Sequence, residues 1–580
     1  MNTSIIRRQA VADAHAENWS AGLHPILAQI YAHRGVHSAA ELERSVQQLL
    51  PWQDLSGIDE AVDLLYQALA QRQRILIVGD FDADGATSCA VAVRALRLLG
   101  SASVDFLVPN RFEYGYGLTP EIVAVAIARY RPQLLVTVDN GIASHSGVAA
   151  ARAAGIRVLI TDHHLPAETL PDADAIVNPN RAGDGFASKH LAGVGVIFYV
   201  MLALRARLRQ QGWFDSQAIP VPKLSGLLDL VALGTVADVV KLDHNNRILV
   251  AQGLARIRRG LACAGINALI AVSRRQAERL VAADLGFALG PRLNAAGRID
   301  DMALGIQCLL TDDPGQALTL AMELERLNRE RRDIEAAMQT QALDSVDELT
   351  ASLGDDELPF GLCLYDPAWH QGVIGILASR IKERLHRPVV AFAPAGNGDI
   401  KGSARSVPGL HIRDVLDAVA NAHPGLLNRF GGHAMAAGLT LAEDRLEDFS
   451  TAFDTEVRRH LSTSDLRGVV YSDGPLTVQQ MSLELAEELR MAGPWGQGFP
   501  EPVFDGAFSV SQSAIVGDRH LKLKLIPVAS TACAPIDAIA FNTLPEDLPG
   551  HQIQCAYRLD VNEYRGQRTV QLIVEHIEAV

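Results

Sequence analysis

The chain has 580 residues, a length that suggests three or four domains. Its formal net charge of −15 argues against a protein that coats nucleic acid non-specifically, although it does not exclude a local basic groove. Six scattered cysteines, with no Cys-x-x-Cys pair, indicate reduced thiols in a cytoplasmic protein rather than a disulfide framework or a zinc cluster.

The N-terminal region, residues 1–55, is expected to be helical, and no chemistry can be assigned to it. Asp59–Arg72 is amphipathic and predicts a helix that leads into the first strand. The longest nonpolar run, Leu191–Leu204, is too short to cross a bilayer and predicts a core helix.

A buried strand is predicted at Ile75–Val78, and three carboxylates follow it at alternate positions: Asp80, Asp82 and Asp84. A helix is then predicted at Ala86–Leu99. Carboxylates so close together raise one another's pKa unless cations neutralise them, and all-oxygen ligation suits Mg²⁺ or Mn²⁺. A polar turn with an N-cap aspartate would explain one of these acids, but not three.

Two later strands also end in candidate metal ligands. Leu134–Val138 is followed by Asp139, and Arg157–Thr161 by an Asp-His-His sequence that contains His163 and His164. Short apolar strands that alternate with helices predict a doubly wound parallel sheet, in which ligands bind at the carboxyl ends of the strands. The converging acids therefore predict a dinuclear metal site, and an imidazole ligand is more typical of Mn²⁺ than of Mg²⁺.

One more acid ends an apolar helix predicted at Leu228–Asp238. We add Asp238 to the site, whereas Asp229 is more typical of a helix start. A lone histidine usually caps a helix or packs in a core. His163 and His164 are assigned to metal binding or catalysis because two other acidic strand ends accompany them.

Four of these segments resemble the signature motifs of the DHH phosphoesterase superfamily: Gly79–Gly85, Val138–Gly141, Thr161–His164 and Gly234–Asp238. The resemblance covers roughly residues 55–580, with no departure at the acidic and histidine positions. Later segments are similar to the bacterial members that degrade single-stranded DNA in the 5′→3′ direction and to their DHHA1 domain: Phe287–Arg298, Trp369–Gly375, Gly402–Ser406 and Phe430–Gly438.

The resemblance implies an α/β fold with several domains. A doubly wound parallel-sheet DHH domain would be joined by a long helix, Asp313–Leu349, to a second α/β domain, DHHA1, followed by a small β-barrel of the OB type. The expected boundaries are 1–55 for the N-terminal region, 56–285 for the DHH domain, 286–350 for the connecting segment, 351–463 for DHHA1 and 464–580 for the barrel.

The resemblance also implies a metal-dependent exodeoxyribonuclease that releases 5′-mononucleotides, with two Mn²⁺ or Mg²⁺ ions. Two ions about 3.5–4 Å apart can activate one water for attack on the phosphorus. By resemblance, Asp139 binds both ions, Asp82 binds one, and Asp84, His163 and Asp238 bind the other.

Further residues are assigned to the substrate by the same resemblance. Asp80 and His164 would complete the metal cluster or orient its ligands and the scissile phosphate. His433 lies in a Gly-rich segment that lets backbone approach a ligand closely, although a plain turn is the alternative. The implied pocket for the 5′-phosphate consists of Arg111, Arg298, Ser403 and Arg405.

The C-terminal segments Leu521–Leu525, Asp537–Phe541, Gln554–Val561 and Thr569–Val574 predict short alternating strands, which indicates a small barrel. Such barrels bind single strands through aromatic stacking and basic residues. A solvated strand face is the alternative for each candidate contact: His520, Lys522, Lys524, Tyr564 and Arg565.

The implied role is DNA recombination and repair, by a monomer that acts on single-stranded DNA with a 5′ end, with a single-strand-binding protein and a helicase as candidate partners. Two alternatives remain at this stage. A DHH enzyme for oligoribonucleotides, cyclic dinucleotides or pyrophosphate is disfavoured by the barrel and the chain length. A non-catalytic DNA-binding scaffold is disfavoured by the intact acidic set.

Overall fold

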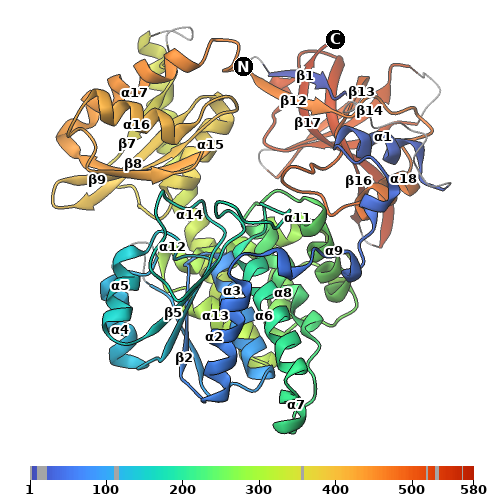
Figure 1. Cartoon of the computed structure of the whole chain (residues 1–580). Helices are drawn as coiled ribbons and strands as arrows, with labels where there is room; N and C mark the ends of the chain where they lie inside the picture. The colour runs from blue at the N-terminus through green and yellow to red at the C-terminus, as the bar shows by residue number, and fades with distance from the viewer. Residues whose placement is uncertain are drawn as a thin grey trace. The chain divides into compact units, whose positions relative to one another are not determined.

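The computed structural model of the chain describes residues 3–9, 22–109, 117–353, 358–517, 520–529, 534–564 and 566–580 (Figure 1). Arg111, Arg565 and the side chain of Tyr564 lie outside what is described. The chain divides into two compact units, and each is treated by itself. One comprises Arg8–Asn328 and Asp473–Val574, and the other comprises Met1–Arg7, Arg329–Ser472 and Glu575–Val580.

The first unit contains a five-stranded parallel sheet with strand order β3-β2-β4-β5-β6. Every residue of β2 and β4 is buried, as their continuous apolar sequences predict. The strands are β2 (Ile75–Gly79), β3 (Val104–Leu107), β4 (Leu134–Val138), β5 (Arg157–Thr161) and β6 (Ala175–Val177).

Helices cover both faces of this sheet (Figure 1), which confirms the doubly wound architecture. The helix α3 begins earlier than predicted because Asp82 caps it, its Oδ1 accepting a hydrogen bond from the amide of Gly85 at 3.0 Å. One face carries α4 (Pro120–Arg129) and α5 (His145–Ala153), and the other carries α3 (Ala83–Leu98) and α6 (Gly193–Gln210), with α2 (Ile58–Ala70) beside α6.

A helical layer follows in the same unit. The predicted apolar helix is α8, and it packs against α3, α6 and α9 with its first eight residues buried. The helices of this layer are α7 (Trp213–Ser216), α8 (Leu228–Ala237), α9 (His244–Arg258), α10 (Ala264–Val272), α11 (Ala282–Asp284), the π-helix η7 (Leu285–Leu289), α12 (Gly290–Ile299) and α13 (Ala303–Leu310).

The β-barrel prediction is confirmed: the last strands close in the order β13-β14-β15-β17-β16. Two of the candidate contacts, Lys522 and Lys524, lie 3.9 and 3.0 Å from the carboxylate of Asp537. The barrel is preceded by α18 (Leu483–Ala492) and consists of β13 (Phe504–Val516), β14 (His520–Pro527), β15 (Ile536–Ala540), β16 (Gln552–Tyr564) and β17 (Gln567–Ala579).

The expectation of an all-helical N-terminal region is wrong. Residues Thr3–Arg7 form β1, which pairs in parallel with β12 (Gly468–Ser472), and among the described residues of this region only α1 (Pro25–His33) is an α-helix. Short 3₁₀ turns follow at Ala39–Leu42, Val46–Gln48 and Trp52–Asp54. The sequence did not predict this strand because its partner β12 is distant along the chain, and such pairing leaves no local pattern in the sequence.

After α1, the guanidinium of Arg34 makes two parallel hydrogen bonds to the carboxylate of Asp473, at 2.9 and 3.0 Å. His33 Nδ1 lies 3.0 Å from the same carboxylate, and the amide of Val503 donates to it. Both side chains of the Arg34–Asp473 pair are 1% exposed. The N-terminal helix is therefore fixed to the segment that leads into the barrel.

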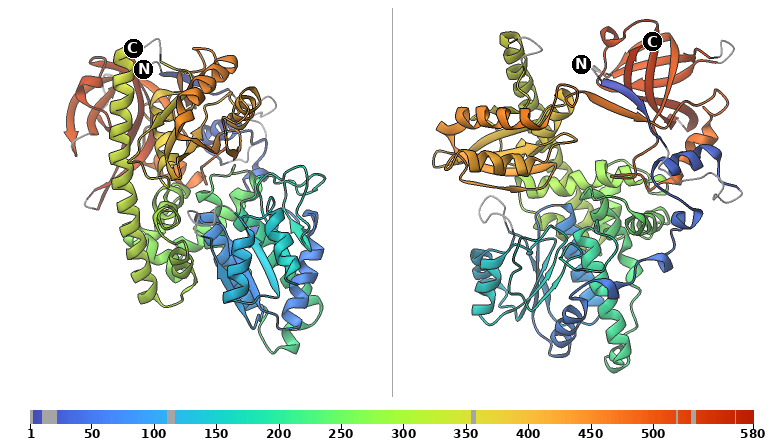
Figure 2. Two further views of the ribbon diagram at one scale, coloured as in Figure 1. Left: turned by 90° about the vertical axis from the view of Figure 1, so that its left-hand side faces the viewer. Right: turned by 45° about the horizontal axis from the view of Figure 1, so that its top comes forward.

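The second unit is built on a sheet of order β10-β11-β9-β8-β7, with core clusters on both faces. Figure 2 shows α14 (Pro314–Leu353) as one long helix, as predicted. Its residues up to Asn328 belong to the first unit, and in the second unit its residues Met338, Ala342 and Val346 belong to one of these clusters. The other elements are β7 (Leu362–Tyr365), β8 (Val389–Gly396), β9 (Asp399–Arg405), β10 (Arg429–Gly432), β11 (Ala436–Ala442), α15 (Ile374–Leu385), α16 (Ile412–Ala422) and α17 (Leu446–His460). No helix in the described ranges is long and apolar enough to cross a membrane.

Candidate metal centre

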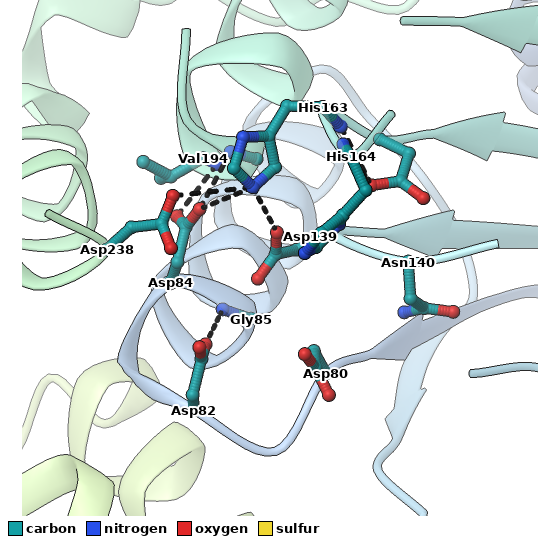
Figure 3. Close-up of polar contacts among 12 residues, drawn as sticks. Asp80, Asp82, Asp84, Gly85, Asp139, Asn140, His163, His164, Val194 and Asp238 are labelled. Carbon is teal, nitrogen blue, oxygen red and sulfur yellow. Dashed lines mark hydrogen bonds and ion pairs between the residues drawn. The ribbon is translucent and has the colours of Figure 1, made fainter. Parts of the chain in front are cut away.

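The predicted acids and histidines of the first unit meet at the carboxyl edge of its sheet (Figure 3). Asp80, Asp82 and Asp84 come from the turn after β2 and the start of α3, and Asp139 follows β4. His163 and His164 follow β5, and Asp238 caps the carboxyl end of α8. Their ligand atoms form three groups within 4.8 Å: Asp80, Asp82 and Asp139; Asp84, His163 and Asp238; and Asp139, His163 and His164.

His163 lies among three of the carboxylates. Its Nε2 is 3.1 Å from Asp139 Oδ1 and 3.3 Å from Asp238 Oδ2, and 4.0 Å from Asp84 Oδ2. Figure 3 shows the ring facing all three acids. Asp139 thus belongs both to the group with Asp80 and Asp82 and to the group around His163.

The carboxylate of Asp84 is held by the amino-terminal end of α6. The amides of Gly193 and Val194 donate to its two oxygens at 2.7 and 2.9 Å. A Cβ on Gly193 would lie 2.5 Å from Asp139 Oδ1, so only glycine permits this approach. Burial raises the pKa of Asp84 to about 7, and the neighbouring charge of Asp82 adds to the shift.

Asp139 has a left-handed backbone, with φ of 62°, which is uncommon for a residue other than glycine and concentrates at functional sites. Burial, together with the charges of Asp84 and Asp82, raises the pKa of Asp139 well above its ordinary range. Burial and the same two carboxylates also raise the pKa of Asp238. Buried acids that oppose one another's ionisation, with one imidazole between them, are suited to hard divalent cations such as Mn²⁺ and Mg²⁺.

Asp162 is a supporting residue that the sequence did not place in the site. Its Oδ1 lies 2.7 Å from His164 Nδ1, and its Oδ2 accepts a hydrogen bond from the amide of Ile142 at 2.9 Å. Burial alone would lower the pKa of His164, but the hydrogen bond and charge of Asp162 outweigh it and raise the pKa to about 9. Asp162 therefore favours the protonated form of His164.

The turn that carries Asp82 and Asp84 is held by α12. Asn294 Oδ1 accepts a hydrogen bond from the amide of Ala83 at 2.8 Å, and a Cβ on Gly297 would lie 1.8 Å from the carbonyl oxygen of Phe81. Both residues lie within a motif already singled out in the sequence, but only the structure shows their contact with this turn.

The predicted phosphate contacts are divided between the two units. Arg298 is on α12 of the first unit, whereas Ser403 and Arg405 are on β9 of the second. Arg405 donates to Ser403 Oγ at 3.1 Å and to Ser379 Oγ at 3.2 Å. His433 is exposed just beyond β10, and its amide donates to the carbonyl of Ala436. Whether these side chains form one pocket stays a prediction.

Comparisons with known proteins agree with this geometry. Three family models match: the DHH family, N-terminal domain, at residues 74–235; the DHHA1 domain at 359–459; and the RecJ OB domain at 472–576. The single-stranded-DNA-specific exonuclease RecJ of Escherichia coli is 56% identical over 578 residues, covering 99% of this chain and 98% of its own. The chain belongs to the RecJ family.

Other RecJ proteins support the same conclusion. RecJ of Haemophilus influenzae is 50% identical over 560 residues, which is 96% of each chain. The crystal structure of Thermus thermophilus RecJ in complex with Mn²⁺ has a TM-score of 0.80 and 30% identity, covering all of this chain and 80% of that one. The complex of the same protein with Mg²⁺ has a TM-score of 0.75 and 28% identity.

Proposed function

We propose that this chain degrades single-stranded DNA from its 5′ end, releases 5′-mononucleotides and serves in DNA recombination and repair. Membership in the RecJ family makes it a metal-dependent, single-stranded-DNA-specific exonuclease. The observation that carries the proposal is the complete set of acids and histidines at the ends of β2, β4, β5 and α8.

The cofactor is Mn²⁺ or Mg²⁺, and the donor set fits two ions. Asp80, Asp82 and Asp139 would hold one, and Asp84, His163 and Asp238 would hold the other, with Asp139 close enough to His163 to be shared. Bound divalent ions stabilise the developing charge on a phosphate and lower the pKa of a coordinated water.

The chain's own residues supply positioning. The α6 amides fix both oxygens of Asp84, so its carboxylate cannot rotate away from the cluster. Asp162 favours the protonated form of His164, which would offer a positive charge to the scissile phosphate. A cationic side chain that interacts more strongly with the phosphate in the transition state than in the ground state lowers the activation barrier for hydrolysis.

We assign the 5′-phosphate to Ser403 and Arg405 of the second unit, and we keep Arg298, His433 and Arg111 as candidate substrate contacts. Arg405 is largely buried, and burial lowers the pKa of its guanidinium. Within the described residues it contacts two hydroxyls and a carbonyl, but no carboxylate. A buried guanidinium of this kind is suited to a phosphate, which accepts two parallel charge-assisted bonds.

The test compares strands that differ only at the 5′ end. Arg405→Ala should slow hydrolysis of 5′-phosphorylated single strands roughly tenfold or more, and that of 5′-hydroxyl strands much less. Arg429→Ala, an exposed arginine on β10, is the matched control and should change neither rate. Equal losses on both substrates, or digestion that begins at the 3′ end, would refute the assignment.

The remaining features are also proposals. A monomer that works with a single-strand-binding protein and a helicase would meet its substrate where a duplex is opened. A cytoplasmic location is supported by the free cysteines, five of which lie among the described residues.

A further inference from the structure

The most exposed large hydrophobic side chain of the described residues is Phe287, at 81%. It lies in the π-helix η7, whose other apolar side chains, Leu285, Ala288 and Leu289, are buried. π-helices are rare and occur preferentially at functional sites. The segment thus buries every large apolar side chain except one aromatic ring.

The position of Phe287 is fixed by the glycines on either side of it. A Cβ on Gly286 would lie 3.2 Å from Val236 Cγ1, and a Cβ on Gly290 would lie 3.2 Å from Ala237 Cβ. The π-helix therefore packs on the last turn of α8, which Asp238 caps.

The same continuous helical segment also reaches the other side of the acidic cluster. Ten residues beyond Phe287, Gly297 contacts the carbonyl of Phe81, and Asn294 holds the amide of Ala83. Because Asp84 and Asp238 belong to one group of ligand atoms, the segment that carries Phe287 borders this group from both sides. Phe287 therefore lies on a segment that packs directly against the elements carrying Asp84 and Asp238.

We propose that Phe287 stacks on a nucleobase of the bound single strand, close to the scissile phosphate. This inference rests on the proposed function. Bound metal ions and basic side chains act on the phosphates of the strand, so its uncharged bases need contacts of their own. Stacking on an aromatic ring meets that need, and it tolerates every sequence because each base has a π-face.

The experiment uses the full-length protein with Mn²⁺ and 5′-phosphorylated single strands. Phe287→Ala and Phe287→Leu should raise KM roughly tenfold with little change in kcat, and Phe287→Trp should retain the wild-type KM. Leu261→Ala, which truncates another exposed apolar side chain, is the control and should leave KM unchanged.

Strands with a single abasic position identify the base involved. Wild type should lose affinity when one particular base is absent, and Phe287→Ala should be insensitive to that change because stacking is already lost. An equal abasic penalty in both proteins, or a wild-type KM in Phe287→Leu, would overturn the proposal. A drop in melting temperature together with weaker Mn²⁺ binding in Phe287→Ala would also overturn it, because the ring would then be a structural contact. Failure of the wild type itself to degrade single strands would instead refute the proposed function.

Discussion

Asp139 joins three unusual properties in one residue: a left-handed backbone, near-complete burial at 1% exposure, and a pKa raised by burial and by its acidic neighbours. A residue in this conformation costs of order 1 kcal/mol or more and persists only where its surroundings determine it. Here the amide of Asp139 donates to the carbonyl of Thr161, and Gly193 leaves room for its carboxylate.

We expect Asp139→Asn to abolish Mn²⁺-dependent hydrolysis while raising the melting temperature of the metal-free protein at pH 8. The amide keeps the shape but removes a buried charge that the neighbouring carboxylates oppose. Hydrolysis assays and thermal melts with EDTA would measure both effects. Asp172→Asn changes a side chain that is 91% exposed and should alter neither. Substantial residual activity would contradict the assignment of Asp139 to both ions.

The raised pKa of Asp84 predicts how metal binding and stability depend on pH. Its folded pKa is about 7 and its ordinary value is 3.8, so between these values the folded state holds a proton that the unfolded state has released. The stability of the metal-free protein should therefore fall as pH rises through this window. Saturating Mn²⁺ neutralises the carboxylate, so the rise in melting temperature on adding Mn²⁺ should be larger at pH 8 than at pH 5. An equal or smaller rise at pH 8 would argue against ionised Asp84 as a ligand.

At the scale of elements, α12 fixes the turn between β2 and α3 through the contacts of Asn294 and Gly297. Asn294→Ala should weaken Mn²⁺ binding at least tenfold, because residues that orient metal ligands typically contribute 10–100-fold. Gly297→Ala should have a larger effect, since its Cβ would overlap the backbone of Phe81.

Titration calorimetry with Mn²⁺ would measure these losses independently of activity. Gly305→Ala, on α13, is the matched control, because its Cβ would meet only the flexible side chains of Leu293 and Met302 at 3.1 Å. Normal Mn²⁺ affinity in Asn294→Ala would show that α12 does not position the ligands.

Elements with a local signature were predictable from the sequence. The apolar runs of β4 and β5 set their bounds, and Asp139, His163 and His164, which follow these strands, identified the metal centre. The hydrogen bonds from the amides of Gly193 and Val194 to Asp84 were not predictable from the sequence. They join residues more than 100 positions apart, and main-chain amides carry no sequence signal. The hydrogen bond from the amide of Ala83 to Asn294 and the pairing of β1 with β12 were not predicted for the same reason.

At the scale of the whole molecule, the buried ion pair of Arg34 and Asp473 fixes the N-terminal helix to the barrel's leading segment. Asp473→Ala should destabilise the protein by about 3–5 kcal/mol, because it leaves a buried guanidinium without its partner. Chemical denaturation would measure the loss. Arg558→Ala breaks a more exposed pair with Glu501 and should cost about 1 kcal/mol or less. Equal losses of stability in the two variants would show that the buried ion pair stabilises the protein no more than the exposed pair does.

The same pair should also contribute to acid sensitivity. Burial alone would raise the pKa of Asp473, but His33 and Arg34 outweigh it and lower the pKa below its ordinary value. Its stabilising contribution is present above the ordinary carboxyl range and is lost as pH falls through the folded pKa. Asp473→Ala should therefore reduce stability more at pH 7 than at pH 3, in denaturation curves recorded at both values.

The pairing of α1 with Asp473 also has a consequence for synthesis on the ribosome. The two residues of the ion pair are 439 positions apart. At about 5–20 residues per second, Arg34 leaves the ribosome roughly 20–90 s before its partner has been made. During that interval the nascent chain exposes the face of α1 that later packs on Trp495 and Phe499. The helix α1 therefore reaches its final position only after the segment that contains Asp473, Trp495 and Phe499 has been translated.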